Sequence, residues 1–154
     1  MMSIFKYLIP FFLISWSGYA QQRIPEDLSF FNTTLNTLPQ NPDQAKKVAE
    51  YFLKNPVSST QKAGAQYVLF EYEKLTGNTL KSIEYLFEAK NSVAEAQNEY
   101  LETLILTAIA QTCRTYGMAT MASKYLAKAS GKAASISEET EKNIATSKLV
   151  QEQV

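Results

Sequence analysis

Several residue types that carry chemistry are missing from this chain or nearly so. Its 154 residues include no histidine and a single cysteine, and fifteen basic residues balance fifteen acidic ones. Without histidine, the chain lacks the commonest metal ligand and the commonest general base at neutral pH. One cysteine forms neither an intrachain disulfide nor a thiolate cluster for a metal. Because no excess of positive charge is available to neutralise phosphates, a nucleic-acid partner is not expected either.

Catalytic motifs are missing as well. The sequence holds no glycine-rich phosphate loop and no nucleophile elbow. Glu71 and Glu73 are the best remaining pair of carboxylates, but side chains two residues apart do not face each other on a helix. Serines cluster where helices are expected to begin, and capping explains them there. We therefore expect a protein that is not an enzyme and uses no cofactor and no metal.

The first twenty residues have the layout of a secretory signal peptide. Lys6 is followed by a mostly apolar run over 7–16, and the small residues Gly18 and Ala20 precede a polar stretch. The apolar run is shorter than the ~20 residues that span a bilayer. This pattern predicts cleavage after residue 20, a single mature domain over 21–154, and no stable membrane insertion after cleavage. An uncleaved N-terminal anchor is the alternative.

A phrase of eight residues occurs twice, forty residues apart. Residues 82–89 read SIEYLFEA and residues 122–129 read ASKYLAKA, and each copy follows a glycine, Gly77 or Gly117, at the same distance. A fainter copy lies at 48–54. Similarity at a fixed period is the signature of a repeat architecture, in which successive units stack and share a core.

The hydrophobic pattern predicts helices throughout the mature chain. Apolar residues recur at three- and four-residue steps, and no stretch shows sustained two-residue alternation. Asn41 with Gln44, and Ser92 with Glu95, have the spacing of capping boxes, and Gly131 is placed as a C-terminal helix glycine. The protein is therefore predicted to be all-α, with a long, buried central helix and a polar last helix that caps the stack. The expected helices are 25–38, 42–54, 58–75, 79–90, 92–116, 118–130 and 135–152.

The repeated phrase resembles the second helix of a tetratricopeptide repeat (TPR). That family places a small residue, an aromatic, an aliphatic and an alanine at the spacing seen in 122–129, and the two glycines match its turn between paired helices. Ala110 and Cys113 match packing positions of its first helix. The family's tryptophan and closing proline are absent here. The resemblance implies a short right-handed solenoid of about three antiparallel helix pairs plus a C-terminal capping helix.

The resemblance also implies a use. First helices of such repeats line a concave groove that binds a peptide or a protein, so the chain is expected to be an exported, non-catalytic binding scaffold. The alternative function is a periplasmic sensory module, or a truncated relative of one, in a membrane signalling or transcription-regulator system. The glutamines after residue 20 resemble export signals of the Bacteroidota, which implies a periplasmic location. The groove positions that carry over are Tyr67, Glu71, Lys74, Thr107, Gln111 and Arg114.

Packing explains several other conspicuous residues. Cys113 lies on the apolar side of its helix and is expected to be a small buried hydrophobe. Tyr51, Tyr85 and Tyr125 occupy the same position of the repeat and are expected in the core, and Leu126 is expected to be fully buried. For the six groove positions, solvated helix faces are the alternative to partner contacts.

Overall fold

The computed structural model of the chain describes residues 28–153. The predicted signal peptide, residues 1–20, lies outside the described residues. Those residues form seven α-helices and no strand, which confirms the all-α prediction. The helices are α1 (Ser29–Thr37), α2 (Pro42–Lys54), α3 (Ser59–Leu75), α4 (Thr79–Ala96), α5 (Glu99–Thr115), α6 (Ala119–Ala134) and α7 (Glu139–Gln153).

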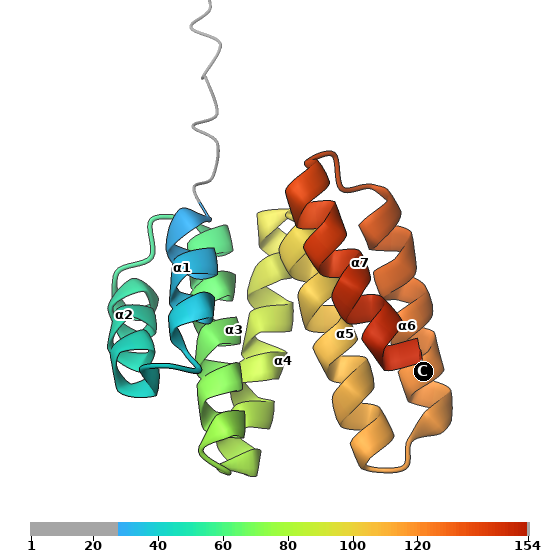
Figure 1. Ribbon diagram of the computed structural model, residues 1–154, viewed down its shortest axis with the longest axis horizontal. Helices are drawn as coiled ribbons and strands as arrows, with labels where there is room; N and C mark the ends of the chain where they lie inside the picture. Colours follow the sequence, from blue (N-terminus) through green and yellow to red (C-terminus); the bar gives the residue numbers. More distant parts are fainter. Residues whose placement is uncertain (1–27, 154) are drawn as a thin grey trace, which may run out of the picture.

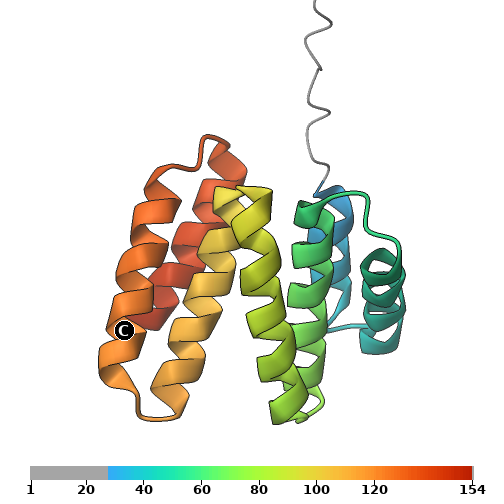
Figure 2. The ribbon, with the colours of Figure 1, turned by 180° about the vertical axis from the view of Figure 1, so that it is seen from behind.

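The helices form three antiparallel pairs and a final single helix (Figure 1). Helices α3 and α4 pack along their length, as do α5 and α6, and α7 packs on both α5 and α6. Helices α1, α3, α5 and α7 contact one another in order, and we call the side they line the front face. The opposite side, where α4 and α6 are seen in Figure 2, is the back face. This arrangement of consecutive pairs is the helical-repeat packing expected from the sequence.

The two main pairs turn in the same way. Gly77 and Gly117 have φ angles of 79° and 73°, which glycine adopts without strain. The following amides reach back to the helix, from Asn78 N to Glu73 O and from Met118 N to Cys113 O, both at 2.8 Å. This is the 6→1 bond of a Schellman motif, which ends a helix at a left-handed residue. The forty-residue repeat is therefore a repeat of backbone geometry as well as of sequence.

Two helices, α2 and α3, start where their predicted side-chain caps place them. Asn41 Oδ1 accepts a hydrogen bond from Gln44 N at 3.3 Å, and Ser58 Oγ accepts one from Gln61 N at 3.1 Å. The Gln44 side chain does not close a capping box, because its Oε1 accepts from the Asn41 side chain instead of the Asn41 backbone. The start and end of α2 at Pro42 and Lys54 agree with the prediction.

The boundary between α4 and α5 was predicted wrongly. There is no break at residue 91, because Ser92 and Val93 are buried and continue the apolar stripe of α4. The chain turns instead at Gln97, which has a φ of 51°, and Asn98 Oδ1 then accepts from Leu101 N at 2.9 Å to start α5. A left-handed residue other than glycine carries no clear sequence signal, so the capping pattern at Ser92 was the more conspicuous and misleading one.

One predicted helix end and several packing predictions were also wrong. Gly131 lies inside α6, because Ala129 and Ala133 on either side of it are buried and extend the helix. Tyr51 is 63% exposed on α2. Leu126 is half-buried at the edge of the core, as are Tyr85 and Tyr125, whereas Leu86 is fully buried.

The first helix pair is anchored by aromatic packing on α3 and α5. The Phe31 ring meets the rings of Tyr67 and Tyr100 edge-on, with centroids 5.9 and 6.2 Å away. Gly64 on α3 allows this approach, since a Cβ there would lie 3.3 Å from atoms of Phe30 and Phe31. The N-terminal pair thus shares one core with the two repeats that follow.

Candidate functional site

Five of the six predicted groove residues meet on the front face. Tyr67 Oη donates to Glu71 Oε1 at 3.1 Å, and the other oxygen of Glu71 lies 3.8 Å from Lys74 Nζ. Lys74 in turn donates to Gln111 Oε1 on α5 at 2.8 Å. One chain of polar contacts therefore links the exposed edges of α3 and α5, helices whose contact residues are thirty-seven positions apart in sequence.

Helix α7 extends this series of polar contacts with a residue that the sequence did not indicate. Glu152 accepts a hydrogen bond from Gln111 Nε2 at 2.8 Å and lies 3.9 Å from Arg114 Nη1. Lys148, one turn earlier, sits 5.6 Å from the centre of the Tyr67 ring. The polar composition of α7 predicted a cap over the stack, but no motif marked Glu152 as part of a site.

Two of the predicted residues have almost no surface to offer a partner. Tyr67 is 2% exposed and Thr107 is 4% exposed. Thr107 Oγ1 donates to Thr103 O at 2.8 Å, which satisfies the hydroxyl within α5. Lys74 and Arg114 are different, because 46% and 47% of their side-chain surfaces remain exposed. We define the polar strip as the accessible part of the network: Glu71, Lys74, Gln111, Arg114 and Glu152.

The buried tyrosine orients the strip from beneath. Burial raises the pKa of Tyr67 well above its usual value, and the adjacent Glu71 carboxylate raises it further. The phenol therefore stays protonated at neutral pH and donates a hydrogen bond to Glu71. This fixed donor holds one carboxylate oxygen, while the other faces Lys74.

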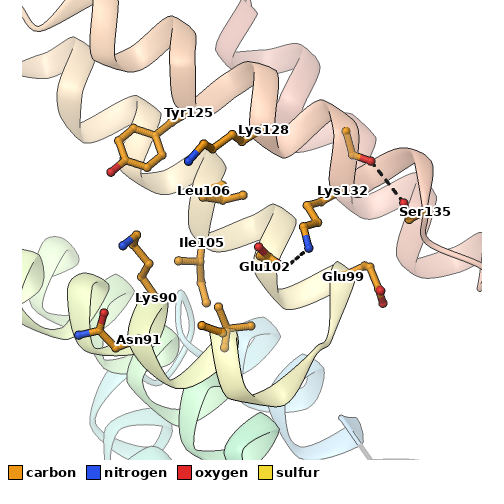
Figure 3. A pocket seen from close by; sticks show the side chains of 13 residues that line it. Lys90, Asn91, Glu99, Glu102, Ile105, Leu106, Tyr125, Lys128, Lys132 and Ser135 are labelled. Atoms are coloured by element: carbon orange, nitrogen blue, oxygen red, sulfur yellow. Dashed lines mark hydrogen bonds and ion pairs between the residues drawn. The ribbon is translucent and has the colours of Figure 1, made fainter.

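A hollow lies on the back face of the molecule. Helices α4 and α6 make no contact with each other within the described chain, and α5 forms the floor between them. The resulting cleft has a volume of about 580 Å³ (Figure 3). We call it the back cleft. It is lined by Lys90, Asn91, Val93, Ala94, Glu99, Glu102, Ile105, Leu106, Tyr125, Lys128, Gly131, Lys132 and Ser135.

Charges are distributed unevenly in the back cleft. At one end Lys132 Nζ lies 2.7 Å from Glu102 Oε2, and this hydrogen bond raises the pKa of Lys132. At the other end the side chains of Lys90 and Lys128 come from opposite walls (Figure 3). Neither forms an ion pair with any residue in the described range 28–153.

Cys113 is a packing residue in the structure. It is 5% exposed, and burial raises the pKa of its thiol, which lowers its reactivity. Among the described residues, no group of three acidic or cysteine side chains is placed to hold a metal ion. In the same part of the chain, no helix combines the length and apolarity needed to cross a bilayer.

Comparison with known proteins gives no relative for this chain. No family model, curated protein or solved structure matches it.

Proposed function

We propose that this chain is an exported, non-catalytic helical-repeat scaffold, similar to TPR proteins, that binds a peptide or protein partner through its front face. The observation that carries the proposal is the polar strip, in which side chains of two successive first helices meet at a solvent-exposed edge. The matching Gly77 and Gly117 turns support the repeat assignment, since they place α3 and α5 in equivalent positions of two units.

The strip has free capacity for an acidic, extended partner segment. A guanidinium group has five N–H donors. The guanidinium of Arg114 takes part in one ion pair, at 3.9 Å, which leaves most of its donors for a partner. The Lys74–Glu71 pair is similarly long at 3.8 Å. Exposed pairs of this kind contribute about 0–1 kcal/mol, so carboxylates of a partner can replace the internal ones at little cost.

The partner-binding proposal is tested with two matched double variants. Lys74→Ala with Arg114→Ala removes both exposed cations of the strip, and Lys62→Ala with Lys124→Ala removes two exposed lysines elsewhere. The immobilised proteins capture partners from an envelope extract, and the captured polypeptide is then purified and titrated against each variant. We expect the strip variant to bind at least ~10-fold more weakly, because hydrogen bonds to charged groups are lost, while the control binds normally. Equal binding by both folded variants would place the site elsewhere.

Export is tested separately by N-terminal sequencing of the protein from a periplasmic fraction. The signal-peptide proposal predicts a new N-terminus at Gln21. Recovery of the chain in the membrane fraction with Met1 retained would favour the uncleaved anchor.

A further inference from the structure

We propose that the back cleft binds a small amphipathic carboxylate, with its carboxylate between Lys90 and Lys128 and its apolar body on α5. This site lies on the opposite side of the molecule from the polar strip and does not depend on the function proposed for the strip. Its volume of about 580 Å³ is in the range of small-molecule pockets, roughly 300–1,000 Å³.

The floor of the back cleft is hydrocarbon. Ile105 and Leu106 of α5 lie at its base (Figure 3), and Val93 of α4 also lines it. These side chains belong to the continuous core of the protein, so their positions are fixed by packing on several sides. Leu106 is 6% exposed and the other two less, so the apolar surface that a bound alkyl or aryl group removes from water here is mainly its own, at about 25 cal/mol per Å².

The two ends of the cleft differ in charge. Lys132 pairs with Glu102 through a 2.7 Å contact, which raises the pKa of Lys132, and the charge of nearby Glu99 raises it further. Glu99 itself forms no ion pair among the described residues. Lys90 and Lys128 at the other end have no such counter-ion among the described residues. A ligand with its anionic end at Lys90 and Lys128 complements this pattern, and an uncharged apolar remainder places no second negative charge near Glu99.

The forty-residue repeat explains why Lys128 is unpaired. The positions equivalent to Leu106 and Lys128 in the preceding unit are Gln66 and Glu88, and there Gln66 Nε2 donates to Glu88 Oε2 at 3.2 Å. In the later unit leucine replaces the glutamine and lysine replaces the glutamate. The internal polar contact is thereby exchanged for an apolar floor with a cation beside it, which is the combination that an amphipathic anion requires.

The experiment is a titration of the protein with octanoate, followed by NMR of the labelled methyl groups. We expect saturable shifts at Ile105, Leu106 and Val93, which report the cleft floor directly. Lys128→Glu, which restores the charge found at position 88, should weaken binding at least ~10-fold, because an attractive charge-assisted contact becomes repulsive. Lys124→Glu makes the same charge change on an exposed part of α6 outside the cleft and should leave the affinity unchanged.

Two further arms separate specific binding from other outcomes. Octanol and octyltrimethylammonium carry the same chain without the carboxylate. If either binds as tightly as octanoate, the cleft selects the apolar chain alone, and the proposal is overturned. An Ala94→Trp variant fills the cleft from its exposed wall and should abolish the shifts. Absence of saturable shifts with millimolar octanoate, or unchanged affinity in Lys128→Glu, would also overturn it, as would binding of an acidic peptide but not of octanoate.

Discussion

The α3–α4 pair and the α5–α6 pair share a backbone and differ in what holds their helices together. In the first pair, two polar contacts join the helices: Gln66 to Glu88 at 3.2 Å and Glu73 to Lys81 at 3.6 Å. At the equivalent positions the second pair has Leu106 with Lys128 and Cys113 with Met121, and its polar contact lies elsewhere, between Glu102 and Lys132 at 2.7 Å.

This difference shows that the repeat geometry does not depend on either kind of contact. Both pairs have the same glycine turn, and residues 71–82 and 111–122 share one pattern of burial and exposure. The buried tyrosines also differ between the units. Tyr67 corresponds to the buried Thr107 of the later unit, and Tyr100 corresponds to the buried Thr60 of the earlier one. The two units therefore share their turn geometry and the small and leucine side chains of the repeated phrase, whereas their polar contacts differ.

The largest expected effect concerns the leucines of the repeated phrase. Leu86 is fully buried and Leu126 is half-buried. We expect Leu86→Ala to lower the free energy of unfolding by roughly 3–4 kcal/mol, because it leaves a cavity in the core, and Leu126→Ala by about 1–2 kcal/mol. Urea unfolding followed by circular dichroism measures both values. Equal losses would show that Leu86 and Leu126 are packed alike, contrary to the structure.

Stability at alkaline pH tests the burial of Tyr67 and Tyr100. Burial, followed by the charges of Glu141 and Glu138, raises the pKa of Tyr100 to about 12, and the pKa of Tyr67 is raised in the same direction. Their phenols remain neutral in the folded protein while the unfolded chain ionises near pH 10, so stability is retained below pH 10 and falls above it. Tyr100 should cost roughly 2 kcal/mol by pH 12, at about 1.4 kcal/mol per pH unit, and Tyr67 should act in the same direction.

The measurement is the urea midpoint from pH 9 to pH 12, with phenolate absorbance at 295 nm recorded in parallel. Tyr100→Phe should flatten the decline relative to the unmodified protein, which controls for lysines that titrate in the same range. An identical decline in both proteins would assign the alkaline loss to other groups.

A smaller effect is expected from exchanging the polar contact of one pair for the apolar contact of the other. Lys81→Met alone leaves the 4%-exposed Glu73 without its partner and should cost about 2 kcal/mol. Adding Glu73→Cys reproduces the residues of the second pair, and the double variant should return to within about 1 kcal/mol of the original stability. Urea midpoints check this. A double variant as unstable as the single one would mean that the two pairs need different contacts after all.

Much of the fold could be predicted from the sequence because its signals are local. Glycines at matching positions, proline at the start of α2 and the side-chain caps at Asn41 and Ser58 each act within a few residues. The prediction of the α4–α5 junction failed because Gln97 adopts a left-handed conformation that no local sequence signal marks, whereas Ser92 offered a false cap.

The candidate site was only partly predictable. The repeat placed Glu71, Lys74, Gln111 and Arg114 on one face, and the structure brings them together. Burial of a side chain, however, depends on which helices cover it, and Tyr67 is covered by Phe31 from α1 and by Lys148 from α7. No local pattern around residue 67 carries that information. The part played by Glu152 was missed for the same reason.

The absence of contact between α4 and α6 gives α5 two roles. Among the described residues, the α3–α4 pair and the α5–α6 pair meet only where α5 lies against α4 and α3. The same helix carries Gln111 and Arg114 of the polar strip and Ile105 and Leu106 at the floor of the back cleft. A substitution that disturbs the packing of α5 is therefore expected to affect both faces of the molecule.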